Sequence, residues 1–394
     1  MERLRREAEA RRDRLIATRR DLHAHPEIAF QEIRTADIVA HRLAELGFEV
    51  QTGVGKTGVV GVMEGERAGD GHTLLLRFDM DALPIHEQVD VPFRSQRDGW
   101  MHACGHDAHT AIGLSVAELL AADRAAWSGT AKFVFQPAEE IVAGARAMID
   151  DGVLENPRPD RALSLHVFST LPTGVIAMTD GPTMAGSGAF TITVRGRGAH
   201  GAMPHQGADP ILGAAHIITA LQSIVSRNVN PMEQAVVTVG YVHGGTAHNI
   251  IPDDVELGGT TRAFSTAVGD LLNQRIQEIA QHTARALGVE AVVSISESAT
   301  PPLINDAGLA EVVRRQARRL VGAEHVRTDV RLMGAEDAAL FLQAMPGAYV
   351  FVGAGNPAKG IDEPHHSPRF QIDEDALPIA VALLTASAID MLND

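Results

Sequence analysis

The segment MHACGHDAH (101–109) brings a thiol and an imidazole together, since Cys104 and His106 stand two residues apart just before a predicted helix. Thiolate and imidazole are both metal-ligand types, and this spacing in a short turn allows the two side chains to chelate one ion. A buried cysteine beside surface histidines would give the same sequence. The segment alone therefore supports a metal site and a structural cysteine equally.

Two adjacent carboxylates follow an apolar, strand-like run in FQPAEE (135–140). In α/β sheets, binding sites lie outside the carboxyl ends of the strands, which is where Glu139 and Glu140 stand. One of them could bind a metal ion while its neighbour, facing the other way, acts as a base. Solvated loop charges are the alternative interpretation of this pair.

Histidines at two further places complete the set. His166 lies in the apolar run 161–167, and His365 and His366 lie in the loop PHHSPRF (364–370). Each place by itself fits a buried core histidine or a flexible surface histidine. Four such signals at strand ends or in loops of one α/β domain are harder to explain separately. Together they offer a thiolate, a carboxylate and three imidazoles, enough for two metal ions that share ligands.

The elements that must position these residues alternate along the first half of the chain. Apolar runs at 72–79, 130–136 and 161–167 are typical of buried strands, and they are separated by helical spacing at 107–122 and 141–150. Strands that alternate with helices predict a layered α/β domain with a mostly parallel sheet. Before them we expect mostly helix over residues 1–47, followed by strands at 48–52 and 59–63.

The pattern then changes to the order β-α-β-β-α-β, which is that of a ferredoxin-like unit, at 187–196, 208–227, 233–242, 254–264, 267–287 and 289–296. A helix at 307–321 and a strand at 348–355 follow. We therefore expect an α/β catalytic metal-binding domain in two pieces, 1–184 and 298–394, interrupted by an inserted α+β ferredoxin-like domain at 185–297. The inserted domain is expected to act as a lid or dimerisation domain.

The composition narrows the class of protein. The 394 residues are 45% hydrophobic and 21% charged, as in globular proteins, and 50 acidic against 34 basic residues give a formal net charge of -16. Such a surface repels phosphate backbones and anionic lipid, which argues against nucleic-acid and membrane partners. A single cysteine cannot form an internal disulfide. The charged first twenty residues lack a signal-like apolar region, and the apolar stretch Ala376 to Ile389 is too short for a span, so we expect a cytoplasmic protein.

Six motifs together resemble the aminoacylase/carboxypeptidase family of binuclear metallohydrolases, namely MHACGHD, QPAEE, the LH strand end, GxGAHGAMPHxGxDP, HNIIP and HHSP. The chain is most similar to the subfamily of hippurate hydrolase, N-acyl-amino-acid amidohydrolases and plant auxin-conjugate hydrolases. The resemblance runs from DLHAHPE (21–27) to HHSPRF. One departure lies in the family's SED-F pattern, which reads Gly334-Ala335-Glu336-Asp337-Ala338 here and lacks the aromatic residue. This departure bears on substrate size rather than on mechanism.

The resemblance implies a role for each of these residues. The metal ligands would be Cys104, His106, Glu140, His166 and His366, and Glu139 would be the general base. His366 is chosen over His365 because the histidine directly before Ser-Pro matches the family ligand. Three residues of the inserted domain would contact the substrate: His200, Asn249 and Arg262.

The function implied is that of a metal-dependent amidohydrolase that cleaves N-acyl-L-amino acids, hippurate-like or N-acetyl, to a carboxylate and a free amino acid. Two divalent ions, Mn²⁺ or Zn²⁺ with Co²⁺ or Ni²⁺ as further options, would supply a hydroxide and polarise the carbonyl, with Glu139 moving the proton. His200 would hydrogen-bond the oxyanion, and the fork of Arg262 suits the substrate's carboxylate. We expect a homodimer or homotetramer.

Three alternatives stay open. Cys104 could instead be a nucleophile activated by His106 or His102. The chain could be a metal-dependent exopeptidase of the same family, acting on dipeptides or as a carboxypeptidase. It could also bind acyl amino acids without cleaving them.

Further polar residues near these motifs are candidates for support rather than for chemistry. Asp79 and Asp81, in FDMDALP, could orient a ligand histidine. His102, Asp107 and His109 are either similar supports or bystanders.

Overall fold

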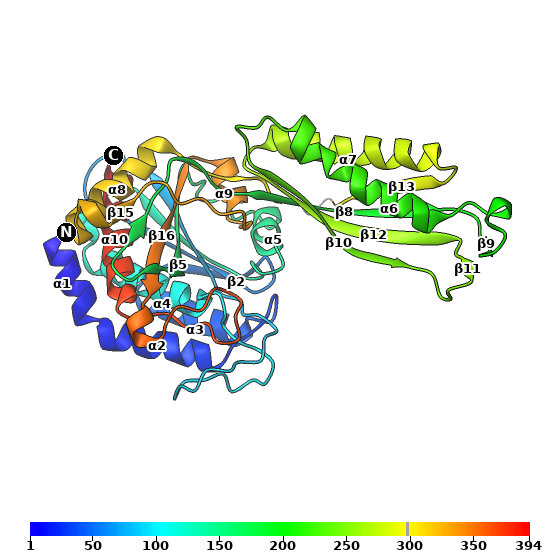
Figure 1. Ribbon diagram of the computed structural model, residues 1–394. Helices are drawn as coiled ribbons and strands as arrows, with labels where there is room; N and C mark the ends of the chain where they lie inside the picture. Colours follow the sequence, from blue (N-terminus) through cyan, green and yellow to red (C-terminus); the bar gives the residue numbers. More distant parts are fainter. Residues whose placement is uncertain (297–298) are drawn as a thin grey trace. The chain divides into compact units, whose positions relative to one another are not determined.

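The computed structural model describes residues 1–296 and 299–394, and this part of the chain divides into two compact units (Figure 1). Unit 1 comprises Met1–Gly181, Ile304–Arg331 and Asp337–Asp394. Unit 2 comprises Pro182–Leu303 and Leu332–Glu336. The expected boundary between 297 and 298 falls on residues outside the described part.

Unit 1 is built around an eight-stranded sheet with the order β1-β2-β4-β3-β5-β16-β6-β15. Its strands are β1 (Glu49–Val54), β2 (Gly58–Glu64), β3 (Thr73–Asp79), β4 (Thr130–Gln136), β5 (Arg161–Pro172), β6 (Ile176–Ala177), β15 (Val326–Arg327) and β16 (Gly347–Gly355). The central strands β4, β3, β5 and β16 are parallel to one another, whereas β1 and β2 extend the sheet as antiparallel strands. The mostly parallel α/β sheet expected from the sequence is confirmed.

Helices cover both faces of this sheet, with α4 and α10 on one side and α5 and α9 on the other (Figure 1). The helices of unit 1 are α1 (Glu2–Ala10), α2 (Arg12–Ala24), α3 (Ile33–Glu45), α4 (His106–Ala122), α5 (Gly144–Asp150), α8 (Ala307–Val321), α9 (Ala339–Ala344) and α10 (Ala376–Asn393). Because both faces are covered, the central strands carry long apolar runs, and all nine residues of β16 are buried. The buried polar residues Arg77 and Lys132 interrupt these runs in β3 and β4. The helical N-terminal region is divided into α1, α2 and α3.

The C-terminal helix α10 is the core helix of unit 1. Among the described helices, it is the one whose length and apolarity would suffice to cross a membrane. Its 18 residues are 78% buried inside the protein. The helix is longer than the apolar stretch suggested, because it continues to Asn393. Pro378 lies in its first turn, where no intrahelical N–H donor is needed.

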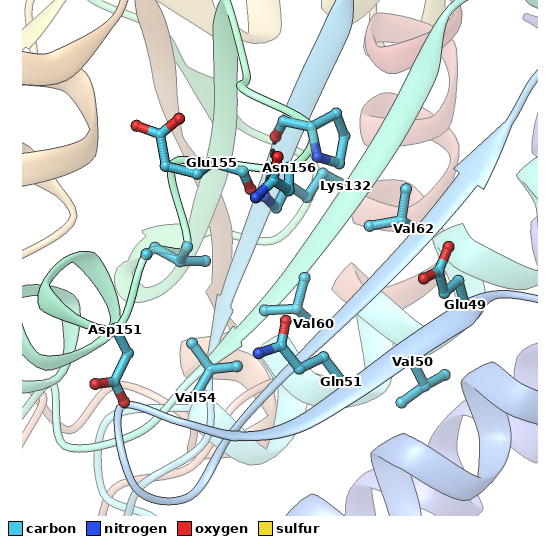
Figure 2. Close-up of a pocket in the computed structure, with 13 residues that line it drawn as sticks. Glu49, Val50, Gln51, Val54, Val60, Val62, Lys132, Asp151, Glu155 and Asn156 are labelled. Carbon is cyan, nitrogen blue, oxygen red and sulfur yellow. Dashed lines mark hydrogen bonds between the residues drawn. The ribbon is translucent and has the colours of Figure 1, made fainter.

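A cavity of about 100 Å³ lies beside β1, β2 and β4 (Figure 2). The buried Lys132 of β4 donates from Nζ to the main-chain oxygens of Glu155 and Pro157, at 2.6 and 3.0 Å. Burial lowers the pKa of Lys132 to about 8. Lys132 lies near the start of β4, away from its carboxyl end at Gln136, so this lysine ties a loop to the sheet at a distance from the predicted site.

Unit 2 is a four-stranded antiparallel sheet with the order β10-β12-β8-β13, on which two helices pack. Its elements are β8 (Gly186–Arg195), α6 (Pro210–Leu221), β10 (Ala235–Gly244), β12 (Asp254–Ala263), α7 (Thr266–Ala286) and β13 (Glu290–Ile295), with a small two-stranded antiparallel sheet of β9 (Ala199–His200) and β11 (Ile250–Ile251). The buried core of the unit includes Ile192, Ile217, Leu257, Leu272 and Ile276. This is the ferredoxin-like order expected from the sequence. The short strands β7 (Gly181–Met184) and β14 (Leu303–Asn305) lie where the chain passes between the units.

Candidate metal centre

The carboxyl ends of β3 and β4, the middle of β5 and the start of α4 bring most of the predicted residues together in unit 1. His166 is not at a strand end as expected, because β5 continues to Pro172. Cys104 and His106 flank Gly105, which has a φ of 89° and forms the N-cap of α4. A Cβ at this position would lie 2.5 Å from Cγ2 of Val167, so glycine is required for both conformation and space. The glycine therefore lets the loop carry the thiol and the imidazole against Val167 in the middle of β5.

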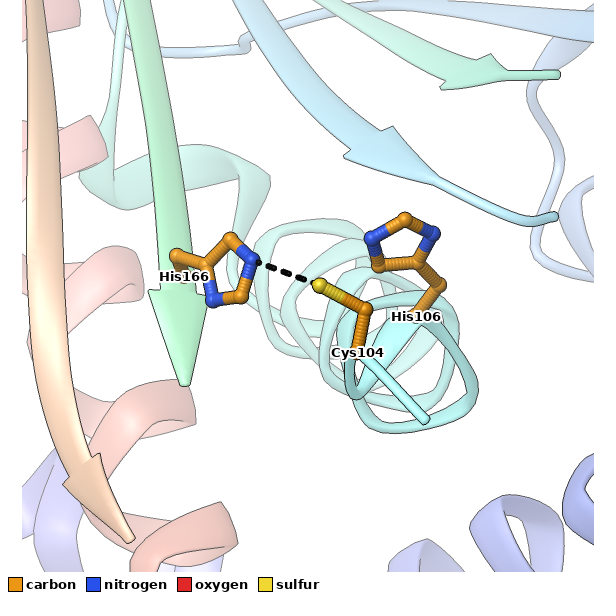
Figure 3. A group of neighbouring side chains, drawn as sticks. All are labelled: Cys104, His106 and His166. Atoms are coloured by element: carbon orange, nitrogen blue, oxygen red, sulfur yellow. Dashed lines mark hydrogen bonds between the residues drawn. The ribbon is translucent and has the colours of Figure 1, made fainter. Parts of the chain in front are cut away.

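The first group of donor atoms belongs to Cys104, His106 and His166, which are all buried and lie within 4.8 Å of one another (Figure 3). Cys104 Sγ is 3.5 Å from His166 Nε2. His166 comes from β5, whereas the other two come from the start of α4 (Figure 3). The parallel sheet thus joins residues that are distant in sequence at one edge.

A second group shares the same thiol and comprises Cys104, Glu140 and His366, whose donor atoms also lie within 4.8 Å of one another. Glu140 Oε2 lies 3.3 Å from His366 Nε2, and Glu140 Oε1 lies 3.9 Å from His106 Nε2. The structure therefore brings all five predicted ligands into two groups that share Cys104. Glu139 lies with Glu140 and His106 in a third such group.

The two histidines of the PHHSP loop point to different partners. His366 has a φ of 66°, and its main-chain N–H donates to Ala103 O at 2.8 Å, which fixes it beside Cys104. His365 Nε2 instead lies 3.1 Å from Val167 O, and its ring stacks on Phe168. His366 is thus the one of the two that lies beside Glu140, and its choice as the ligand stays a prediction.

The donor set fits divalent metal ions. Within the described part of the chain, the buried atoms His106 Nε2 and Glu140 Oε1 have no hydrogen-bond partner. Buried polar atoms without a partner are costly, and a cation between them would satisfy both. Burial and the nearby Glu140 raise the pKa of the Cys104 thiol, so a bound metal ion is needed to hold it as a thiolate.

Asp81 supports this cluster from the loop after β3. His106 Nδ1 donates to the main-chain oxygen of Asp81 at 2.9 Å and approaches its Oδ1 at 3.2 Å, which leaves Nε2 directed at the other ligands. The two carboxylate oxygens of Asp81 accept from the main-chain N–H groups of Glu139 and Glu140, at 3.1 and 3.0 Å. Asp81 thus orients His106, one of the predicted ligands, and also holds the turn of the two glutamates.

Asp79 and His109 form a second support. His109 Nδ1 donates to Asp79 Oδ1 at 2.6 Å, and His109 Nε2 accepts from the N–H of Val167 at 2.9 Å. Although burial opposes it, His106, His109 and Arg77 hold the pKa of Asp79 well below its usual range. The sequence did not decide whether His109 is a support or a bystander. In the structure, His109 ties β3 to β5 at Val167, beside His166.

Three supporting residues were missed by the sequence analysis, namely Arg77, Gln136 and Asp337. Arg77 is buried and donates to Asp79 Oδ2 at 2.6 Å, to Gln136 Oε1 at 2.8 Å and to Asp337 Oδ1 at 3.1 Å. Asp337 also accepts from Gln136 Nε2 at 2.7 Å and from Ala145 N at 2.9 Å. An arginine inside the apolar run LLLRFD is the one signal that pointed to this network. Ala338, which follows Asp337 in the sequence, is fully buried at the position where the family pattern has an aromatic residue.

The predicted substrate contacts of unit 2 fall into two places. His200 in β9 pairs with Ile250 of β11, and Asn249 O accepts from Gly201 N at 2.8 Å, so His200 and Asn249 are neighbours. This two-stranded sheet lies at the start of β12, since Gly198 N donates to Asp253 Oδ1 at 2.8 Å. Arg262 is near the opposite end of the ten-residue strand β12, and a strand of that length spans about 30 Å. Within unit 2, Arg262 is therefore not brought together with the other two.

The chain is similar to known proteins along most of its length. Residues 75–390 match the pattern of peptidase family M20/M25/M40. The chain is 39% identical over 381 residues to IAA-amino acid hydrolase ILR1-like 4 of Arabidopsis thaliana, covering 95% of this chain and 85% of that one. It is 38% identical over 396 residues to thermostable carboxypeptidase 2 of Saccharolobus solfataricus, covering 100% and 99%.

A solved Bacillus subtilis structure, described as a dinuclear metal binding peptidase of the M20 family, superimposes with a TM-score of 0.85 at 36% identity and covers 98% of this chain and 99% of that one. Both the sequence and the fold are thus shared along nearly the whole chain. The chain therefore belongs to peptidase family M20/M25/M40 and is a metal-dependent hydrolase of amide bonds.

Proposed function

We propose that this hydrolase cleaves the amide bond of N-acyl-L-amino acids, releasing a carboxylate and the free amino acid. The observation that carries the proposal is the pair of donor groups sharing Cys104, with Glu139 in the same turn as the ligand Glu140. The similarity to a hydrolase named for amino acid conjugates supports this class of substrate. We expect a cytoplasmic enzyme with no nucleic-acid or membrane partner.

The proposed ligands of two divalent ions, Mn²⁺ or Zn²⁺ with Co²⁺ or Ni²⁺ as further options, are Cys104, His106, Glu140, His166 and His366. When bound, the ions supply Lewis-acid polarisation of the carbonyl and a lowered pKa for water. His106 is oriented for this role by Asp81, and His166 is carried by strand β5. The thiolate and imidazoles suit zinc, whereas carboxylate suits manganese, so the set does not favour one metal.

Glu139 is the proposed general base. It is 8% exposed, and its main chain is fixed by the carboxylate of Asp81. The carboxylate takes one proton from the attacking water and delivers it to the amine nitrogen as the C–N bond breaks. The same residue thus serves as base and then as acid, which balances the protons of hydrolysis.

Residues of unit 2 are proposed to recognise the substrate, and this unit is proposed to act as a lid or dimerisation domain. The planar fork of Arg262 matches a free α-carboxylate. His200 suits the oxyanion of the tetrahedral intermediate, and Asn249 stands beside it. Because about 30 Å separates the two places along β12, one small substrate cannot contact both within a single unit 2.

We therefore propose a homodimer, or a homotetramer built from such dimers, in which these two places come from different copies. Edge strand β10 offers unpaired main-chain groups, and its exposed Tyr241 and Val242 add apolar surface. A second copy of the chain that pairs along this edge would cover both the main-chain groups of β10 and this apolar surface. Light scattering after size-exclusion chromatography measures the molar mass of the assembly and so distinguishes a monomer, a dimer and a tetramer.

The experiment that tests the proposed substrate is a hydrolysis panel with hippurate, N-acetyl amino acids and dipeptides, each assayed with Mn²⁺, Zn²⁺, Co²⁺ or Ni²⁺. Cleavage of N-acyl amino acids well above dipeptides supports the proposal. Dipeptides as the better substrates would favour exopeptidase action, which the similarity to a carboxypeptidase makes the second candidate. Binding of acyl amino acids without cleavage under every metal would overturn both.

A further inference from the structure

The turn after β4, residues 137–142, carries both glutamates and has an unusual backbone. Ala138 has a φ of 53° and Val142 a φ of 56°, in the left-handed region that residues with a Cβ rarely adopt. Such conformations are strained and persist only where the surrounding structure holds them. Glu139 and Glu140 lie between these two residues, so the direction of their side chains depends on what holds the turn.

Three successive main-chain N–H groups of this turn donate to buried carboxyl groups. The N–H groups of Glu139 and Glu140 donate to the two oxygens of Asp81. The N–H of Ala138 donates to Oε1 of Glu32 at 2.9 Å. Asp81 also contacts His106 and so belongs to the metal cluster, whereas Glu32 reaches the turn from a different part of the chain.

Glu32 is built into the core of unit 1 for this contact. Its side chain is fully buried at the N-terminus of α3, which packs on β1 and β2. Its second oxygen, Oε2, accepts from Thr57 Oγ1 at 2.6 Å. Both oxygens therefore have a donor, which offsets the cost of burying the group. Thr57 lies in the turn between β1 and β2, so two rigid elements hold the carboxyl group against Ala138.

We propose that Glu32 is a positioning residue for hydrolysis, which keeps Ala138 in the left-handed conformation that directs Glu139 into the site. This inference rests on the proposed role of Glu139 as the base. Loss of the Ala138 contact frees the strained residue directly before the base, while Asp81 still holds the N–H groups of Glu139 and Glu140. Turnover therefore falls while metal binding is retained, because rates drop steeply when a reacting group moves by about 1 Å.

Glu27 provides a matched control from the same segment. It is also buried, at 7% exposed, and its carboxylate accepts from the main-chain N–H groups of Arg34 and Thr35 at 3.1 and 2.9 Å. These bonds cap the first turn of α3 and do not involve the turn of the glutamates. Removing Glu27 thus costs a comparable pair of hydrogen bonds without releasing Ala138.

The test compares the variants E32A, E32Q and E27A as metal-loaded full-length proteins. Metal content, Tm, kcat and KM are measured with an N-acyl amino acid that the wild type cleaves. For E32A we expect a kcat about 10- to 100-fold lower, with two metals per chain and little change in KM. E32Q can still accept from Ala138 and donate to Thr57, so its kcat stays near that of the wild type. E27A should lower Tm without lowering kcat.

A wild-type kcat in E32A would overturn the inference, and so would an E32Q variant as slow as E32A or an E27A variant with the same loss of kcat. If E32A does not fold, the isosteric variant T57V, which removes one partner of Glu32, replaces it and should lower kcat by a smaller factor. The proposed base is judged separately by the variant E139Q. An active E139Q contradicts the role of Glu139, whereas an inactive E139Q with an unimpaired E32A contradicts only the role of Glu32.

Discussion

Asp81 contacts His106 twice, since His106 Nδ1 lies 2.9 Å from the main-chain oxygen of Asp81 and 3.2 Å from its Oδ1. The same carboxylate accepts from the main chain at Glu139 and Glu140. One side chain therefore orients the imidazole of His106, a proposed ligand, and sets the course of the turn that carries Glu140 and Glu139, the proposed second ligand and base. Such supports are usually worth 10- to 100-fold in metal affinity.

Replacing Asp81 by alanine should therefore lower the metal affinity by about 10- to 100-fold, measured by competition with a chromogenic chelator. The variant Asp306→Ala is the control, because Asp306 caps α8 by accepting from Leu309 N at 2.9 Å. It should lose about 1 kcal/mol of stability with unchanged metal affinity. Wild-type affinity in the Asp81 variant would show that His106 is oriented without it.

The variant Glu139→Gln should retain two metals per chain and lose about 10²- to 10⁴-fold in kcat, because the amide cannot accept the proton of water. Metal content by plasma mass spectrometry and a progress curve at high enzyme concentration check both parts. Normal turnover would exclude Glu139 as the base. Loss of metal together with activity would instead assign Glu139 to the ligands.

Cys104 distinguishes a metal centre from a cysteine nucleophile. Cys104→Ala should lower metal occupancy after dialysis, and a chelator should abolish wild-type activity until Mn²⁺, Co²⁺ or Zn²⁺ is added. In the loaded protein a metal ion would occupy the buried thiol, so iodoacetamide should modify the metal-free protein faster than the loaded one. Inactivation by iodoacetamide with indifference to chelators would favour the nucleophile.

Mixing inactive variants tests whether one site uses two copies of the chain. Glu139→Gln is co-refolded at equal amounts with His200→Ala in one sample and with Arg262→Ala in another. If His200 and Arg262 serve one substrate from different copies, one of the two mixtures should recover about a quarter of wild-type activity, from random pairing into dimers. Recovery in neither mixture, or in both, would contradict this arrangement.

Glu32 makes stability depend on pH in a defined direction. Burial raises the pKa of Glu32 from its ordinary 4.5 to about 7, so the folded chain binds this proton more tightly than the unfolded chain. The contribution of Glu32 to folding stability therefore decreases as the pH rises from about 4.5 to 7, by up to about 3 kcal/mol. Urea denaturation of wild type and E32Q at several pH values should show this difference, and parallel curves would contradict it.

The sequence predicted the central strands and the ligand types because both depend on local patterns. Apolar runs such as 130–136 are recognisable when a strand is buried on both faces, and Cys104 and His106 are close in sequence. The two-residue strands β6 and β15 have no such signal. They exist only because neighbouring strands offer a free edge.

The residues that hold the site in place were harder to predict than the ligands. Glu32 carries no motif of its own, and the family pattern at Asp337 does not name its partners, which are the side chains of Arg77 and Gln136 and the N–H of Ala145. The partner of Glu32 at the site is likewise a main-chain group distant in sequence, Ala138 N. Which carboxyl group reaches which N–H follows from packing rather than from residue type. Arg262 shows the same limit, because a role implied by resemblance did not reveal that β12 separates it from His200.

The order of segments in unit 1 has a consequence for biosynthesis. Most of the proposed ligands are made early, but His366 and the central strand β16 come after unit 2, and α10 comes last. A nascent chain can complete the contiguous sheet of unit 2 while unit 1 still lacks a strand in the middle of its own sheet. The five proposed ligands are therefore present together only after the segment that carries His366 has been made, and a nascent chain that ends before it lacks one of them.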